Sequence, residues 1–267
     1  MKKINLIIII SALLLNISCD SIKNAVNTVT NKNPIKLNFK LTDNPRNVKN
    51  AKPDAHVEED TAIIVTLSNP ETCFIGLEEF PLETVGAKIS LLLEKSPAER
   101  ENIYLNVSAS TQYLPFVKMV DKLRLNDIKQ INLIVLPEVK TDVQFHVLKV
   151  KVMPEPKADE TDDEEYYKMT MINLSKDGKI NFARNDKKTY FTLDKEEIKP
   201  EDAEAKIKQF LKEREEKKVL RTGTNEIDKR IYIKATKSSN YAQVVKLLDA
   251  ATGAGADVYL QIDDLSE

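Results

Sequence analysis

The two histidines and two cysteines are the side chains of this chain best suited to metal binding or nucleophilic chemistry. His56 and His146 lie 90 residues apart, and neither sits in a cluster of ligands at metal-binding spacing. Cys73 lies in a strand-like apolar run, where a small buried side chain is the simplest interpretation. The tracts 222–224 and 253–255 contain glycine but lack the Lys-Ser/Thr of a phosphate loop. We therefore expect no enzyme, no metal site and no cofactor.

Cys19 has a different context, because it follows an apolar run at the N-terminus. Lys2 and Lys3 precede residues 4–17, and Ser18 stands just before Cys19. A basic region, an apolar region and a small residue before the cut are typical of a secretory signal peptide. As a helix this run would reach about 21 Å, short of the ~30 Å hydrocarbon core of a bilayer. The run therefore predicts a signal rather than a membrane span, although an uncleaved anchor is the alternative.

Residues 15–19, Leu-Asn-Ile-Ser-Cys, resemble a bacterial lipoprotein signal. In such a signal the cysteine becomes the lipidated N-terminus after cleavage. The resemblance implies a lipid on Cys19 and a membrane-anchored protein of the bacterial cell envelope that faces the periplasm.

The charge of the chain gives no reason to expect nucleic acid as a partner. The formal net charge is −2, and it becomes −4 if Lys2 and Lys3 leave with the signal. A chain without a basic field does not attract a phosphate backbone. Because Cys73 is the only cysteine besides Cys19, neither an intramolecular disulfide nor a cysteine metal cage is expected.

The second half of the chain repeats the pattern of the first half. Three residues recur 128 positions further on: Tyr104, Tyr113 and Asp121 correspond to Tyr232, Tyr241 and Asp249. Apolar positions between them recur as well, which indicates an internal repeat. The repeat predicts two small domains of one type, and the 42% apolar content is sufficient for two modest cores.

Each copy is predicted to contain the elements β-β-α-β-α-β. The expected strands are 62–67, 73–77, 104–109 and 131–136 in copy one, and 169–174, 179–183, 232–236 and 257–262 in copy two. Apolar residues at helical spacing from Val85 and Ala203 predict the first helix of each copy, and those from Phe116 and Val244 predict the second. The fold class is therefore α+β: two tandem small sandwiches, each with two helices on one face of a mixed sheet.

Composition places the boundaries between these parts. Residues 1–19 form the signal peptide, and the polar, proline-containing residues 20–60 are predicted to be a tether. The first domain takes residues 61–141 and the second takes 166–267. Between them, residues 142–165 end in a run of carboxylates and are predicted to be an extended acidic linker.

Residues 231–256 resemble the signature stretch of the ExbD/TolR family of biopolymer-transport proteins. They read IYIKATKSSNYAQVVKLLDAATGAGA, which is a strand, a short loop, a tyrosine, a helix with a Val-Val…Asp core, and Ala-Gly. Residues 103–136 are similar but lack the glycines, and residues 147–156 resemble the extended segment ahead of the family's domain. The resemblance implies two tandem domains of the periplasmic type.

Two departures from the family bear on function. The family carries an aspartate in a transmembrane helix and uses it in proton coupling, whereas residues 4–17 hold no ionisable side chain. The family's Ala-Asp becomes Ala109-Ser110 and Ala235-Thr236. The resemblance therefore implies binding without an energy input from this chain alone.

The candidate binding residues are the two tyrosines at the start of the second helices and the residues at the family's aspartate position: Tyr113, Tyr241, Ser110 and Thr236. The alternative for the tyrosines is packing, with rings in the core and hydroxyls in water. The alternative for Ser110 and Thr236 is the capping of turns.

Two functions follow from these observations. The first is a non-enzymatic envelope lipoprotein that acts as a periplasmic binding or accessory module for TonB-type transport or envelope integrity. Its partner would be a TonB-like or ExbB/TolQ-like protein or peptidoglycan, and a homodimer is left open. The second is a membrane-anchored ExbD-like transporter subunit assembled with an ExbB-like channel.

Overall fold

The computed structural model describes residues 41–54, 57, 62–95, 102–138, 145–153, 170–183, 196–221 and 223–262. The chain divides into two compact units, Met1–Leu37 and Asn38–Glu267, and every described residue lies in the second unit. The predicted signal peptide with Cys19, His56 and the acidic run 159–165 fall outside the described residues. Among the described residues, no helix is long and apolar enough to cross a membrane.

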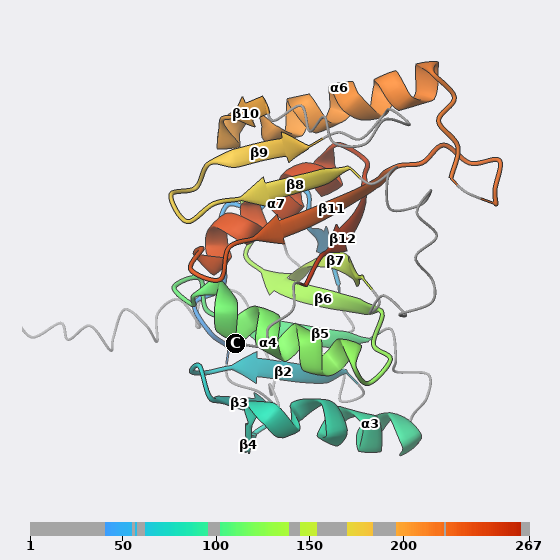
Figure 1. The fold of residues 1–267 in the computed structure, drawn as a ribbon. Coiled ribbons are helices and arrows are strands. Elements are labelled where there is room, and N and C mark those ends of the chain that lie inside the picture. The colour runs from blue at the N-terminus through green and yellow to red at the C-terminus, as the bar shows by residue number, and fades with distance from the viewer. Residues whose placement is uncertain are drawn as a thin grey trace, which may run out of the picture. The chain divides into compact units, whose positions relative to one another are not determined.

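The described strands join into one mixed sheet that carries four described α-helices (Figure 1). The first half supplies β2 (Ile63–Leu67), β3 (Thr72–Ile75), β4 (Glu78–Pro81), α3 (Val85–Lys95), β5 (Ile103–Val107), α4 (Tyr113–Arg124) and β6 (Gln130–Val135). The second half supplies β8 (Met171–Leu174), β9 (Ile180–Ala183), β10 (Glu196–Ile198), α6 (Ala203–Glu216), β11 (Arg230–Ala235), α7 (Tyr241–Gly253) and β12 (Asp257–Leu260). Short 3₁₀ turns, Leu82–Thr84 and Pro200–Asp202, precede α3 and α6.

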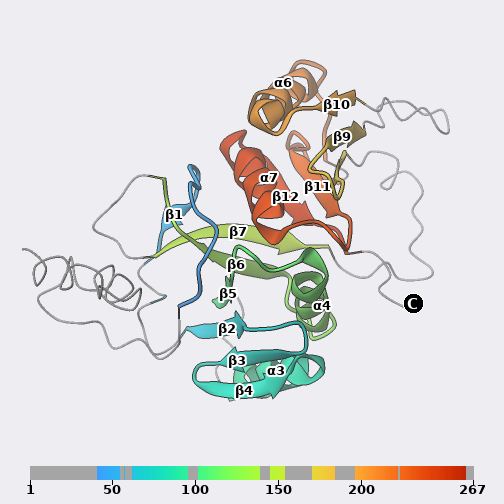
Figure 2. The same cartoon turned by 90° about the vertical axis from the view of Figure 1, so that its left-hand side faces the viewer.

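The strand β7 (His146–Val152) lies between the two halves. The strand order is β4-β3-β2-β5-β6 on one side of β7 and β10-β9-β8-β11-β12 on the other, so both halves have the same topology (Figure 2). Because β7 is antiparallel to β6 and parallel to β12, the two halves run in opposite directions. An approximate two-fold rotation therefore relates the two halves.

The α+β class with a mixed sheet is confirmed, but a division into two tandem domains is not shown. Both halves contribute their strands to one sheet, and their apolar residues form one buried cluster. The predicted linker 142–165 is also wrong in part. Residues 146–152 form the central strand β7, in which Val147, Leu148, Val150 and Val152 are buried, because both edges of this strand pair with other strands.

The predicted element order missed one strand in each half. The strands β4 and β10 are short and pair antiparallel with β3 and β9, which gives the order β-β-β-α-β-α-β in each half. Glu78 and Glu79 of β4 are exposed, so no apolar alternation marked this strand. The hairpin predicted at Asp177-Gly178 is present, with Gly178 at a φ of 80° between β8 and β9.

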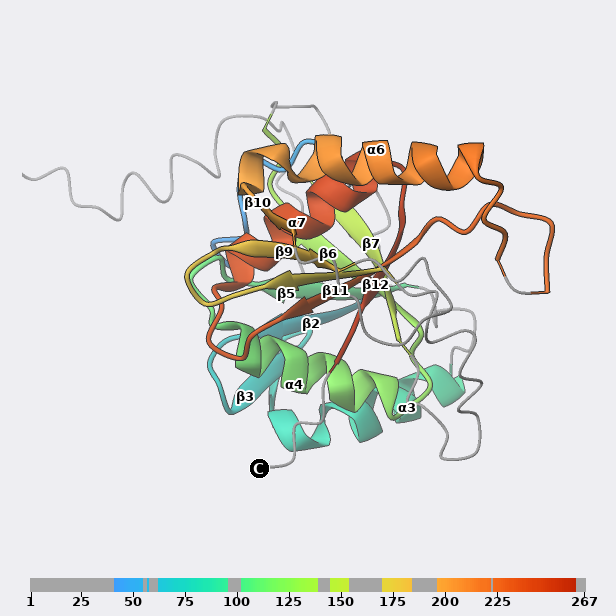
Figure 3. The same ribbon diagram turned by 45° about the horizontal axis from the view of Figure 1, so that its top comes forward.

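The helices have the apolar faces that their spacing predicts. The buried residues of α4 include Phe116, Met119, Val120 and Leu123, and those of α7 include Val244, Leu247, Leu248 and Ala251. The first helices are similar, with Val85 and Ile89 buried in α3 and Ala203 and Ile207 buried in α6. Within each half the two helices pack side by side, α3 with α4 and α6 with α7 (Figure 3).

Residues 42–54, which we call the N-terminal strap, were predicted to be part of a tether but are packed against both halves. Asn44 and Val48 are buried, and Lys52–Pro53 forms β1, a short antiparallel partner of β7. Pro45 O accepts from Leu136 N at 2.9 Å, and Ala109 N donates to Asp43 O at 2.7 Å. Polar side chains and backbone hydrogen bonds hold this segment, so its sequence shows little apolar periodicity.

Asp249 of α7 fixes the middle of the strap. Its carboxylate accepts from Lys49 N at 3.0 Å and from Asn50 N at 2.7 Å, and Asn50 Nδ2 donates to the backbone oxygen of Asp249 at 3.0 Å. Gly253 allows this approach, because a Cβ there would lie 2.4 Å from Asn50 Nδ2. The corresponding residue Asp121 instead pairs with Arg124 on its own helix. The two recurring aspartates therefore have different roles.

This difference predicts unequal costs for two matched substitutions. Asp249→Ala should lower the free energy of unfolding by about 1.5–3 kcal/mol, because two backbone donors lose a charged acceptor. Asp121→Ala should cost less, about 1 kcal/mol, because its carboxylate has a partly buried i,i+3 pair with one side chain of its own helix and holds no other segment. Urea denaturation followed by circular dichroism measures both, and equal losses would contradict the assigned role of Asp249.

A buried charge cluster joins α6 to the start of β11. The carboxylate of Asp228 accepts from Arg230 Nε and Nη2, both at 3.0 Å, and lies 3.6 Å from Arg214 Nη1. Arg214 also donates to the Asp228 backbone oxygen at 2.9 Å and to Thr170 Oγ1 at 2.8 Å. Burial raises the pKa of Asp228, but the Arg230 hydrogen bonds and the two positive charges outweigh it and hold the pKa below the usual 3.8.

The lowered pKa of Asp228 predicts a stability contribution with a defined pH range. The contribution is present above the ordinary pKa of 3.8 and is lost as the pH falls through the lower folded-state pKa. Asp228→Asn at neutral pH should cost about 3–5 kcal/mol, because it leaves two arginines without their buried partner. Asp43→Asn, which removes an exposed pair with Arg46, should cost less than about 1 kcal/mol. Unfolding curves at neutral and acidic pH measure both, and the penalty of Asp228→Asn should shrink in acid; a pH-independent penalty would contradict the account.

Candidate functional site

The loop that precedes α4 in the first half contacts the loop that precedes α7 in the second half. Tyr113 N donates to Ser239 O at 2.8 Å, and Tyr241 N donates to Thr111 O at 3.0 Å. Gln112 and Asn240 form the antiparallel bridge between these bonds. The first backbone N–H groups of a helix have no partner within the helix. Here the backbone of the opposite half satisfies them, so each half caps a helix of the other.

The two tyrosines predicted as binding candidates lie where these loops meet, and their rings are in the core. Phe116 of α4 lies between them, with ring centroids 5.9 Å from Tyr113 and 4.7 Å from Tyr241. Tyr241 is fully buried, and among the described residues its hydroxyl has no hydrogen-bond partner. Burial raises the pKa of this hydroxyl well above its usual value. The interpretation with the hydroxyl in water is therefore wrong for Tyr241, although packing of the ring is confirmed.

Ser110 and Thr236, at the family's aspartate position, take part in turn hydrogen bonds. Thr236 Oγ1 lies 2.8 Å from Ser239 Oγ, and Ser110 Oγ lies 3.0 Å from Ser108 Oγ. These contacts fit the turn-capping alternative. The pair is not equivalent, because Thr236 lines a cavity and Ser110 is not among the residues that line it.

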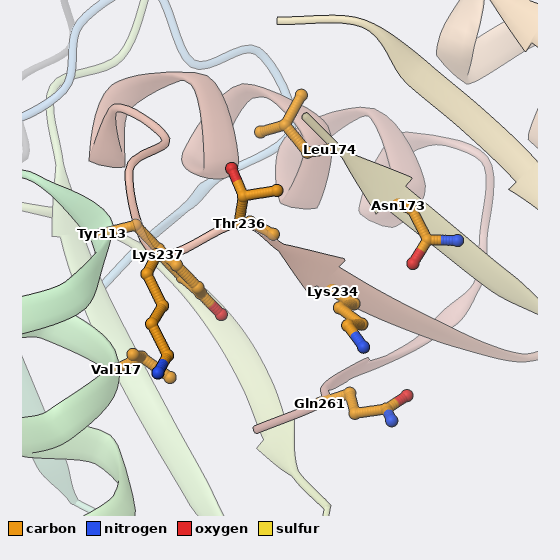
Figure 4. A pocket seen from close by; sticks show the side chains of 9 residues that line it. Tyr113, Val117, Asn173, Leu174, Lys234, Thr236, Lys237 and Gln261 are labelled. Carbon is orange, nitrogen blue, oxygen red and sulfur yellow. The ribbon is translucent and has the colours of Figure 1, made fainter. Parts of the chain in front are cut away.

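A cavity of about 130 Å³ lies between α4 of the first half and the strand ends of the second half (Figure 4). Two of its lining residues, Tyr113 and Val117, come from α4. The others come from β8, β11 and the residues that follow β11 and β12: Asn173, Leu174, Lys234, Ala235, Thr236, Lys237 and Gln261. Pockets for small molecules and cofactors usually measure about 300–1,000 Å³. The size of this cavity therefore fits one or two side chains better than a cofactor.

The polar groups of the cavity include two lysines and a glutamine. Lys234 and Lys237 both line it, and none of the nine described lining residues is acidic. Gln261 Oε1 is enclosed and has no hydrogen-bond partner among the described residues, so it can accept a hydrogen from a ligand. A wider hollow of about 620 Å³ beside α6 has mixed charge, with Lys208, Lys212 and Glu215 in its lining. The smaller cavity is therefore the better defined candidate site.

Sequence reasoning found Tyr113 and Thr236 but missed Lys234, Lys237 and Gln261. Lys234 interrupts the apolar pattern of residues 231–235, and comparison of the two copies places it at the position that corresponds to Asn106. A polar residue at the same position of both copies was the available signal.

The remaining reactive side chains are enclosed by the core. Cys73 is buried in β3, and burial raises the pKa of its thiol to about 11. His146 is buried in β7, and burial lowers its pKa. Within the parts of the chain that the structure describes, no three His, Cys, Asp or Glu side chains gather in a way that could hold a metal ion.

Comparison with known proteins gives a family match for the second half of the chain. Residues 139–264 match the sequence model of the family described as biopolymer transport protein ExbD/TolR. This range is somewhat less than half of the chain and includes β7 and all described elements of the second half. The resemblance read from residues 231–256 is thus confirmed for this part. No curated protein and no solved structure matches the chain.

The position of Tyr241 predicts that two substitutions lower the free energy of unfolding by different amounts. Tyr241→Phe should change the free energy of unfolding by less than about 1 kcal/mol, because it removes a buried hydroxyl without a described partner. Tyr241→Ala should cost about 3–5 kcal/mol, because it leaves a cavity beside Phe116. Thermal and urea unfolding measure both. A large loss for Tyr241→Phe would mean that the hydroxyl makes an essential hydrogen bond.

Proposed function

We propose that this chain, whose second half is of the ExbD/TolR type, is a non-enzymatic lipoprotein of the bacterial cell envelope. It acts as a periplasmic binding or accessory module for TonB-type transport or for envelope integrity. The observation that carries the proposal is the match of residues 139–264 to the ExbD/TolR family. That family is associated with the envelope and with partners of the TonB, ExbB and TolQ type.

The apolar run at the N-terminus supports anchoring by lipid rather than by a coupled membrane helix. Residues 4–17 contain no ionisable side chain that could take part in proton transfer, and Cys19 follows at the position of a lipoprotein cysteine. On this proposal the chain supplies a binding surface, and another protein supplies the energy for transport. The alternative is an ExbD-like subunit held in an ExbB-like channel by an uncleaved helix.

The cavity supports a binding role for the periplasmic part. It brings two lysines, a glutamine with an enclosed acceptor and two residues of α4 to one place between the halves. Catalysis by Cys73 or His146 is not supported, because both side chains are buried in strands. Fold alone does not decide function, so the proposal depends on the site and on the anchor.

The anchoring part is tested by lipid labelling in the bacterium. We expect the chain to incorporate labelled fatty acid on Cys19 and to accumulate as a longer precursor under globomycin, an inhibitor of the lipoprotein signal peptidase. Cys19→Ala should abolish the label. Cys73→Ala is the matched control and should leave the label unchanged, because Cys73 is enclosed in the core.

A second outcome separates the two candidate functions. If the purified chain begins at Met1, carries no lipid and copurifies with an ExbB-like channel, the alternative holds and the lipoprotein proposal fails. If it begins at Cys19, an uncleaved helix is excluded.

A further inference from the structure

The N-terminal strap is attached to the first half mainly through polar groups. Asn106 Oδ1 accepts hydrogen bonds from Thr42 N at 3.2 Å, Thr42 Oγ1 at 2.8 Å and Asn44 Nδ2 at 3.0 Å. The other amide atom of Asn44, Oδ1, is enclosed and has no hydrogen-bond partner among the described residues. An enclosed acceptor without a partner costs free energy. The buried side chain of Asn44 therefore holds the strap less firmly than its three donated contacts alone would.

The attachment of the strap to α7 and β7 is polar as well. The carboxylate of Asp249 accepts two backbone N–H groups of the strap, and β1 pairs with β7 at only two positions. Within residues 42–54, all of which the structure describes, only Val48 belongs to the buried apolar cluster, and Ala51 packs against it. Segments with few buried apolar contacts open at a lower free energy than the core of a protein. The strap is therefore held by a few hydrogen bonds rather than by a core of its own.

The strap turns at Asn47, between its attachments to the two halves. Asn47 has a φ of 61°, in the left-handed region, and its side chain is exposed. Asparagine adopts this region more readily than most residues with a Cβ atom. A substitution at Asn47 can therefore disturb the strap without touching the rest of the molecule.

Comparison of the two halves shows that a half keeps its topology without such a segment. In the first half Asn106 pairs with Thr66, and both are buried. In the second half the corresponding Lys234 pairs with Asn173, and both are only partly buried and line the cavity. The order of strands is nevertheless the same in both halves. A segment over this position is therefore not a requirement of the fold.

We propose that the strap is releasable: residues 42–54 leave the two halves as one unit, while the sheet and the four described helices stay folded. Asp249 is the residue that controls the release, because its carboxylate holds the middle of the strap. A pull on the chain before residue 42 would break the hydrogen bonds of the strap one after another, beginning at Thr42. Release would expose Asn106 and add roughly 40 Å of extended chain, at about 3.3 Å per residue.

Hydrogen exchange of the unmodified full chain in detergent tests the release, read by mass spectrometry at several urea concentrations below the unfolding transition. Two backbone N–H groups outside the strap report on it, because Ala109 N donates to Asp43 O and Leu136 N donates to Pro45 O. We expect these two groups to exchange at least about tenfold faster than the paired N–H groups of β5 and β6, with little dependence on urea. The paired groups should exchange only on global unfolding, with a strong dependence on urea.

Matched variants locate the control of the release. Asp249→Ala should speed the exchange at Ala109 and Leu136 about tenfold or more, although the carboxylate of Asp249 accepts from Lys49 and Asn50 and from neither of these groups. Asp121→Ala, which removes the corresponding aspartate of α4, should leave the exchange at both groups within about twofold of the unmodified chain.

A second pair of variants tests the strap itself. Asn47→Val should also speed the exchange at Ala109 and Leu136, about fivefold, because a β-branched residue is strained at a φ of 61°. Arg46→Ala removes only an exposed pair with Asp43 and should change the exchange by less than about twofold.

Two results would overturn the inference. The first is exchange at Ala109 and Leu136 with the same rate and urea dependence as in β5 and β6, because the strap would then open only when the whole chain unfolds. The second is unchanged exchange at these two groups in Asp249→Ala. Neither measurement involves Cys19 or a partner protein, so failure here is distinguishable from failure of the proposed function.

Discussion

The reciprocal hydrogen bonds at the starts of α4 and α7 are the constraint on which the rest of the structure depends. Tyr113 N and Tyr241 N each donate to the backbone of the opposite half, and β7 joins β6 to β12 in the same sheet. A helix start without partners is costly, so neither half would be complete if the other were removed. This arrangement also sets α4 beside the strand ends of the second half and so forms one wall of the cavity.

Within this frame the two halves hold the strap through different residues. In the first half Asn106 accepts hydrogen bonds from Thr42 and Asn44 of the strap. In the second half the carboxylate of Asp249 accepts from the backbone of Lys49 and Asn50. The strap therefore joins the two halves although their corresponding residues differ, and the family match lies on the second half.

The sequence predicts the helices well and the strap poorly, for a physical reason. The faces of α4 and α7 bury large apolar residues at helical spacing, which is the strongest signal that a sequence carries. The strap carries no such signal, because Asn44 is buried through hydrogen bonds. Tyr113 could be picked from the repeat, and Thr236 from the resemblance to the family's Ala-Asp. Lys234 carried a weaker signal, a polar residue at the position of Asn106, and Gln261 follows the last strand without any such signal.

The most direct measurement of the central claim is equilibrium unfolding of the full chain, followed by one probe in each half. The account predicts that both probes report a single transition, because each half caps a helix of the other and β7 joins them in one sheet. Two separate transitions, one for each half, would contradict the account.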